Sequence, residues 1–251
     1  MLQAFVFPKS KVIEDLKKLP ALPMAMIPPS DGGGNPYFTG EVIRLLFLDI
    51  DGVVTSHKVQ IVHGTLASGK HDHELKKAVV KNPEAVDLMA IGLINKLCEH
   101  TDTHIVISSS WRIGFTLQQV QSMMDQIGIN SDLVIGMTDT KGACRGNEIA
   151  RFLEKIQTPE GILEMTDAGH LDKLFLNFEV VKVGAYVIIE DDVSSLLPSQ
   201  SKNIIATTFM EGLGCEQTIE AGKILTNDET FYLNRLGGED SVGEKKGFCW
   251  N

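Results

Sequence analysis

The sequence predicts an α/β fold, a Rossmann-like three-layer sandwich around a mostly parallel central sheet. Its 251 residues, 43% of them hydrophobic and 22% charged, suffice for one folded core. Short apolar runs alternate with segments of helical periodicity, which is typical of consecutive βαβ units. Acidic or hydroxyl residues follow three of the apolar runs. Because ligands of open parallel sheets lie at the carboxyl ends of the strands, this pattern predicts a site at that edge.

The predicted strands are short apolar runs. Val42–Leu48 is nearly continuous, as expected of a strand buried on both faces. His104–Ile107 is a second short apolar run, and Leu133–Ile135 is also predicted to be a strand. Tyr186–Ile189 is the third strong strand, and Ile204–Ala206 is a weaker one.

The predicted helices lie between these runs. Pro83–His100 has apolar residues at helical spacing, with Asn82 as the expected N-cap. Further helices are predicted at Thr116–Ile127, Gly146–Lys155, Glu216–Leu225 and Glu229–Leu236.

Charge and cysteine usage limit the possible partners. The net charge of −10 makes the chain a poor unassisted binder of nucleic acid or anionic lipid. The four cysteines include no Cys-x-x-Cys pair, which excludes the usual zinc ribbons. Neither a transmembrane segment nor a secretory signal is recognisable. The sequence predicts a cytoplasmic protein, with a secreted effector without a classical signal peptide as the alternative.

Carboxylates cluster at the predicted strand ends. Asp49 and Asp51 follow the first run and, being two residues apart, point to the same side, while Gly52 permits a sharp turn. The Tyr186 run ends in Glu190-Asp191-Asp192. Clustered like charges repel, and a divalent cation such as Mg²⁺ would relieve the repulsion. One carboxylate of the first pair could then attack phosphorus while the other transfers the leaving-group proton.

These residues resemble motifs of the haloacid dehalogenase (HAD) superfamily of phosphatases. Leu46–Val53 is similar to the first motif, Ile105–Ser108 to the second and Val187–Asp192 to the fourth. The third motif is a lone basic residue at a helix start, for which Lys141 and Arg145 are candidates. The pair Trp111-Arg112 and the segment Arg145–Ile149 look closest to a capless branch that is also found fused to RNA-repair proteins.

The resemblance implies a role for each matching residue. Asp49 would be the nucleophile and a metal ligand, and Asp51 the acid and base, with its carbonyl on Mg²⁺. Ser108, Ser109 and a basic residue would hold the phosphoryl group, and Arg145 is preferred over Lys141 because it immediately precedes the predicted helix. Asp191 is the expected third metal ligand, with Glu190 and Asp192 as alternatives.

Structural roles compete with these functional ones. Asp49–Gly52 could be a turn with side-chain to backbone hydrogen bonds, and Asp191 or Asp192 could cap a helix near Val193. Ser110 is expected to cap a helix, Trp111 to lie in the core or a pocket wall, and Arg112 could form a surface ion pair.

The domain boundaries follow from composition. Residues 1–40 read as a Pro/Gly-rich leader, 41–236 as the HAD-like catalytic domain with an insertion at about 157–183, and 237–251 as a flexible tail. No interval is long enough for a full cap domain, so the site is expected to be open.

An open site suits a phosphate group on a macromolecule, which itself excludes water. The acidic charge favours a phosphoprotein, including phosphotyrosine, over the alternative of a polynucleotide end. A catalytically retired HAD fold used as a binding module is the third possibility, although it would need neither Asp49 nor Asp51.

Overall fold

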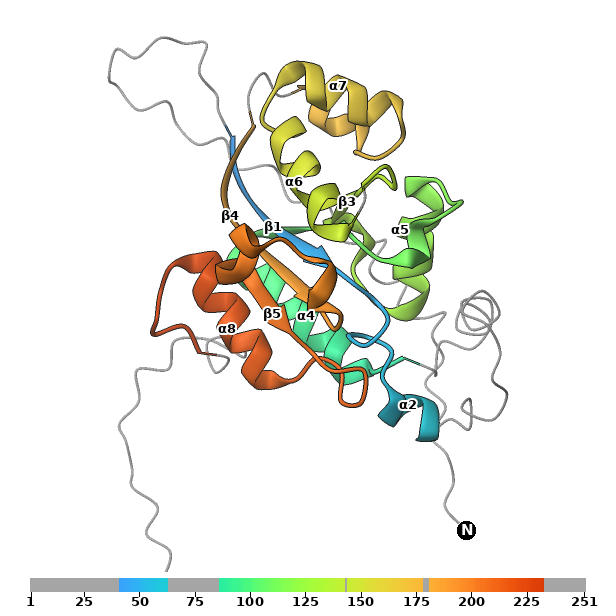
Figure 1. Cartoon of the computed structure of the whole chain (residues 1–251), viewed down its shortest axis with the longest axis vertical. Coiled ribbons are helices and arrows are strands. Elements are labelled where there is room, and N and C mark those ends of the chain that lie inside the picture. The colour runs from blue at the N-terminus through green and yellow to red at the C-terminus, as the bar shows by residue number, and fades with distance from the viewer. Residues whose placement is uncertain (1–40, 63–85, 143, 178–180, 233–251) are drawn as a thin grey trace, which may run out of the picture. The chain divides into compact units, whose positions relative to one another are not determined.

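The structure, a computed structural model, describes residues 41–62, 86–142, 144–177 and 181–232. In these ranges it contains one sheet that is flanked by helices (Figure 1). The strand order is β3-β2-β1-β4-β5, and every pair of neighbouring strands is parallel. The strands are β1 (Glu41–Leu48), β2 (Thr103–Ile107), β3 (Val134–Met137), β4 (Val181–Glu190) and β5 (Ile204–Ala206). The predicted α/β architecture is confirmed.

Strand β1 is central because both of its faces are apolar. Leu46 and Leu48 belong to one buried cluster, whereas Leu45 and Phe47 belong to another on the opposite face. All four side chains are fully buried, as expected for an inner strand covered on both sides.

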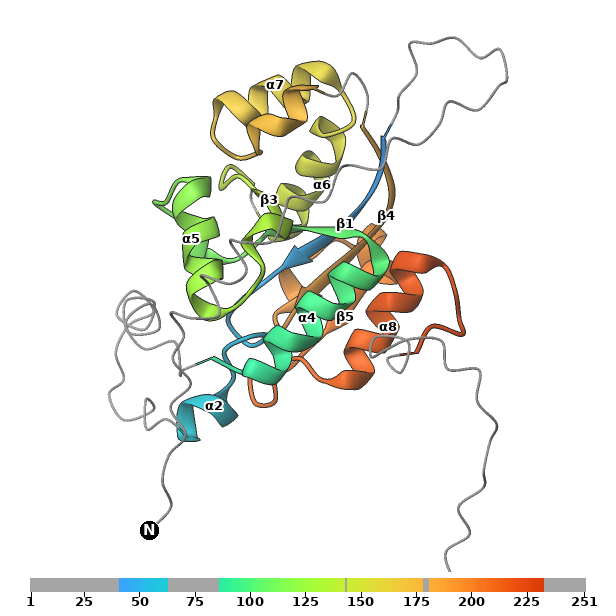
Figure 2. The ribbon, with the colours of Figure 1, turned by 180° about the vertical axis from the view of Figure 1, so that it is seen from behind.

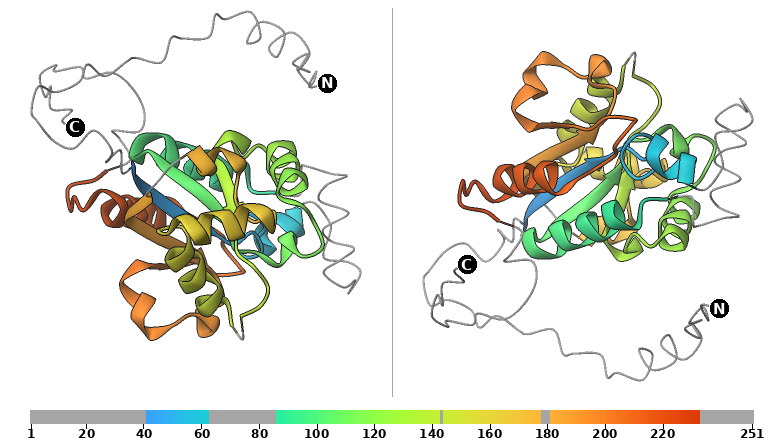
Figure 3. Two further views of the ribbon diagram at one scale, coloured as in Figure 1. Left: turned by 90° about the horizontal axis from the view of Figure 1, so that it is seen from above. Right: turned by 90° about the horizontal axis from the view of Figure 1, so that it is seen from below.

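Helices cover both faces and make the three layers. One layer consists of α4 (Leu88–Thr101), α5 (Leu117–Ile127) and α8 (Cys215–Thr226), whose apolar residues join the cluster that contains Leu46 and Leu48. The other contains α6 (Arg145–Lys155) and α7 (Pro159–Asp167). Figure 2 shows α6 and α7 on one side of β1 and α4 and α8 on the other, and Figure 3 views these layers from above and below.

Short helices complete the connections. Helix α2 (His57–Val62) follows the β1 turn. The 3-10 helices are η3 (Ser110–Arg112), η4 (Ser131–Leu133), η5 (Lys173–Asn177), η6 (Val193–Ser195) and η7 (Pro198–Asn203). Among the described residues, the connections between strands consist of these short helices, the longer helices above and loops.

Two predicted helix boundaries are wrong. Helix α4 begins at Leu88 because the Asp87 carboxylate accepts hydrogen bonds from the backbone N–H groups of Met89 and Ala90; Asn82 lies outside the described residues. The helix expected from Glu229 does not start there, since the Asp228 side chain accepts bonds from Thr230 and forms a turn instead.

The leader 1–40 and the tail 237–251 lie outside the described residues. Residues 157–177 of the predicted insertion form α7 and η5, and Ile162, Met165 and Phe175 join the apolar cluster beside α6. Among the described helices, none has the length and hydrophobicity that a bilayer crossing requires.

Candidate active site

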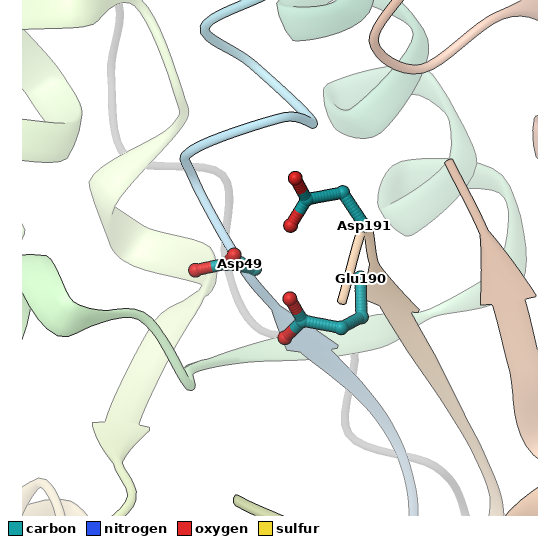
Figure 4. A group of neighbouring side chains, drawn as sticks. All are labelled: Asp49, Glu190 and Asp191. Atoms are coloured by element: carbon teal, nitrogen blue, oxygen red, sulfur yellow. The ribbon is translucent and has the colours of Figure 1, made fainter. Parts of the chain in front are cut away.

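Polar side chains gather at the carboxyl edge of the sheet. Leu48 pairs with Ile107 of β2 and Ile189 of β4, so the residues that follow these strand positions are neighbours in space. Asp49, Glu190 and Asp191 each offer a carboxylate oxygen, and these oxygens lie within 4.8 Å of one another (Figure 4). We call these three residues the acidic cluster.

Burial makes the acidic cluster electrostatically costly. Asp49 is 5% exposed and Glu190 is 2% exposed. Burial, reinforced by the negative charge of Asp49, raises the pKa of Glu190 to about 9 despite the opposing effect of Arg145. Burial and Asp49 also raise the pKa of Asp191. The raised pKa values mean that the three carboxyl groups cannot all ionise easily in this place without an additional cation.

The acidic cluster fits a hard divalent cation. Its donors are carboxylate oxygens, which Mg²⁺ prefers. Gly52 leaves space for one of them, since a Cβ added to it would lie 2.2 Å from Asp191 Oδ2. Gly52 also has a φ of +72°, a conformation that favours glycine. Its carbonyl accepts a hydrogen bond of 2.9 Å from Thr207 Oγ1 in the loop after β5, which fixes the turn.

Arg145 is the basic residue that reaches the acidic cluster. It is the first residue of α6, and its Nη1 lies 3.0 Å from Asp49 Oδ1 and also contacts the Glu190 carboxylate. Burial lowers the pKa of Arg145, but the charges of Asp49 and Glu190 outweigh this effect and raise it. Lys141 instead lines a cavity between α6 and α7.

Asp51 occupies a different environment from Asp49. Its two carboxylate oxygens each lie 3.0 Å from the indole Nε1–H of Trp111, which donates to both. The Thr55 hydroxyl donates to Asp51 Oδ1 at 3.1 Å. The Asp51 carboxylate is therefore not one of the grouped ligands, although Asp51 is only two residues from Asp49.

Ser108 and Ser109 have different surroundings. The Ser108 hydroxyl is buried and has no hydrogen-bond partner among the described residues, while its backbone N–H donates to Leu48 O. A buried hydroxyl at a strand end without a partner is suited to a ligand oxygen. Ser109 caps η3 by accepting from the backbone N–H of Trp111, so the cap expected of Ser110 belongs to its neighbour.

The family described as the HAD domain in Swiss Army Knife RNA repair proteins matches residues 45–218. The chain belongs to this family. The match confirms the resemblance stated above and identifies a phosphatase-type hydrolase domain of the HAD superfamily, whose enzymes generally use Mg²⁺. No curated protein and no solved structure gave a match.

A buried arginine, Arg112, connects the loops and the helix that surround the candidate site of the HAD domain. Arg112 is 5% exposed, so it is not the surface ion pair considered from the sequence. It pairs with Glu148 of α6 at 2.6 Å and donates to the carbonyls of Ser109, Thr138 and Asp139. The loops after β2 and β3 are thereby fixed to α6. An arginine next to Trp111 was the only signal in the sequence, and its partner lies 36 positions away.

Asp192 has a structural role in the HAD domain. Its carboxylate accepts from the backbone N–H and hydroxyl of Ser194 and caps η6. These bonds lower the pKa of Asp192. The structure thus supports the capping alternative for this residue and does not group it with the other carboxylates.

Proposed function

We propose that this HAD domain hydrolyses phosphomonoesters with Mg²⁺ through an aspartyl-phosphate intermediate. The observation that supports this most is the acidic cluster beside Arg145 and the unpartnered Ser108 hydroxyl, all at one edge of the sheet. Such an arrangement offers a nucleophile, a cation site and donors for phosphoryl oxygens together.

The proposed reaction has two displacements. A carboxylate oxygen of Asp49 attacks phosphorus, the ester P–O bond breaks, and Asp51 gives its proton to the leaving oxygen. Asp51 then takes a proton from water, whose oxygen attacks phosphorus and releases Asp49 and inorganic phosphate. Ser108 and Arg145 hold the phosphoryl oxygens, and Ser109 keeps the Ser108 loop in place through its cap.

Mg²⁺ would be held by Asp49, Asp191, Glu190 and the Asp51 carbonyl, and when bound it supplies positive charge for the phosphoryl oxygens. In this proposal, the Arg145 guanidinium, which contacts Asp49, turns from that carboxylate toward the phosphoryl group when a substrate binds. Arg145 is preferred to Lys141 for this task because of that contact.

The proposed substrate is a phosphate group on a macromolecule. The described connections provide no cap domain that would enclose a small molecule. The family name concerns RNA repair proteins and favours a polynucleotide end. The net charge of −10 is the argument for a phosphoprotein, including phosphotyrosine, and it has no support from the family match. We therefore rank the polynucleotide end first.

The first test is phosphate release from p-nitrophenyl phosphate with Mg²⁺, with and without EDTA. Release that stops with the chelator and returns with excess Mg²⁺ is the expected result. A folded sample that releases none under any condition would favour the retired binding module. A panel of phosphorylated oligonucleotides and phosphopeptides then ranks the substrates, and a higher kcat/KM for phosphopeptides would reverse our order.

A further inference from the structure

In the part of the chain that the structure describes, the Asp51 carboxylate accepts hydrogen bonds from two residues of separate segments. Trp111, in the loop after β2, donates its indole N–H to both carboxylate oxygens. Thr55, in the turn after β1, donates its hydroxyl to one of them. The two contacts come from residues 60 and 4 positions away, so this carboxylate is fixed from both strand ends.

The indole is itself fixed before any substrate arrives. Trp111 is 1% exposed and belongs to the larger apolar cluster. Its backbone is held by the Ser109 cap, and the next residue, Arg112, is anchored to three carbonyls and to Glu148. The N–H group is therefore preorganised rather than drawn into place by Asp51.

We propose that Trp111 is a positioning residue that keeps the Asp51 carboxylate apart from the acidic cluster and so reserves it for proton transfer. This inference rests on the proposed function. Asp51 follows Asp49 by two residues, on the same side of the chain, and a rotated carboxylate could become another ligand of the cation. The indole N–H opposes that rotation because leaving would break two hydrogen-bond contacts in a partly buried place.

The competing explanation is that Asp51 merely satisfies a buried indole. Buried tryptophan N–H groups usually find a partner, and the ring would then be only a core residue. The two explanations predict different effects of substitution. Replacing a core residue lowers the turnover of all substrates alike. Replacing a residue that positions an acid lowers most the turnover of substrates whose leaving groups need a proton.

The test compares two aromatic substrates of similar size. p-Nitrophenyl phosphate has a good leaving group, whereas benzyl phosphate releases an alkoxide that must be protonated. The parameter is kcat/KM, because it reports attack on the substrate and excludes hydrolysis of the intermediate. Trp111 is replaced by benzothienylalanine, which keeps the ring shape and removes the N–H; Trp111→Phe is the second variant, and Phe115→Leu in the same loop is the control.

We expect kcat/KM for benzyl phosphate to fall about 10-fold or more in both Trp111 variants, with p-nitrophenyl phosphate within about 3-fold, since general acids contribute roughly 10²- to 10⁴-fold in total. Phe115→Leu should change neither. Equal losses for both substrates, or no loss for benzyl phosphate, would overturn the positioning role.

A spectroscopic readout separates this inference from the proposed function. The chain has two tryptophans, Trp111 and Trp250, so the indole N–H signals in an ¹⁵N–¹H spectrum can be assigned with Trp250→Phe. We expect the Trp111 signal to exchange slowly with solvent, to shift in Asp51→Asn, and to keep its position when Mg²⁺ is added. A signal that is insensitive to Asp51→Asn overturns the geometry, whereas an absence of turnover in the unmodified protein overturns the function.

Discussion

Asp49 and Asp51 are two residues apart, yet the fold places them in two different regions. Asp49 lies in the acidic cluster, where like charges are buried together beside Arg145. Among the described residues, the Asp51 carboxylate accepts hydrogen bonds from the Trp111 indole and the Thr55 hydroxyl, which are both neutral. The two-residue spacing brings both carboxylates to the same strand end. Contacts from other segments then determine which carboxylate is suited to a cation and which is suited to proton transfer.

Substitution of each aspartate should separate these roles and gives the largest effect. Asp49→Asn and Asp51→Asn should each lower kcat by well over ~10²-fold, because the first variant loses the proposed nucleophile and the second loses the proposed acid. Only Asp49→Asn should also weaken the rise in melting temperature that Mg²⁺ causes, which thermal unfolding with and without MgCl₂ measures. The comparison fails if Asp51→Asn removes that rise equally.

The basic residues provide the next contrast. Arg145→Ala should lower kcat/KM by about 10²-fold, as expected for the loss of a charged donor to the reacting group. Lys141→Ala is the matched control, because Lys141 lines the cavity between α6 and α7, and it should change kcat/KM by less than about 3-fold. Initial rates with p-nitrophenyl phosphate decide the matter, and a larger effect of Lys141→Ala would contradict the assignment.

Gly52 joins the two regions, and Gly52→Ala tests their separation. The new methyl group meets the Asp191 carboxylate and the backbone has a positive φ, so we expect a loss of roughly 1–2 kcal/mol in the free energy of unfolding and a weaker Mg²⁺ effect. Gly114→Ala is the control, because Gly114 has a φ of +82° but nothing within 4 Å of an added Cβ.

Urea unfolding of both glycine variants isolates the contact. Both variants are destabilised by the positive φ at the substituted position, and only Gly52→Ala also disturbs Asp191. Equal losses, with an unchanged response to Mg²⁺, would mean that the close approach of Asp191 has no part in cation binding.

The smallest effect is expected from Glu190→Gln. Because the folded-state pKa of Glu190 is raised above the ordinary value, its stabilising contribution is present at low pH and is lost as pH rises toward about 9. In EDTA, the melting temperature of the unmodified protein should therefore fall relative to that of Glu190→Gln as the pH rises from acidic to alkaline values. A pH-independent difference between the two proteins would contradict this origin.

The strands and the strand-end motifs could be predicted because they depend on local residues. Ile204–Ala206 agrees with the observed β5, and the run from Val42 lies within β1. The contact between Trp111 and Asp51 could not be predicted, since Asp51 follows another strand. The start of α4 was missed because a capping side chain, Asp87, decided it rather than apolar periodicity.

Side-chain contacts between distant segments also limited what could be predicted about the candidate site. Spacing indicated that Asp49, Asp51 and Asp191 follow neighbouring strands, but it could not tell that Asp51 turns to the indole, or that Asp192 caps η6. Such choices depend on side-chain contacts between segments that are distant in sequence.

The turn after β1 is held by Thr207, which the ribosome adds 155 positions after its partner Gly52. A nascent chain therefore displays the Asp49 segment long before the hydroxyl that secures it has been synthesised. Polypeptides released before β5 would have the Asp49 segment without the Thr207 hydroxyl that holds the turn beside it.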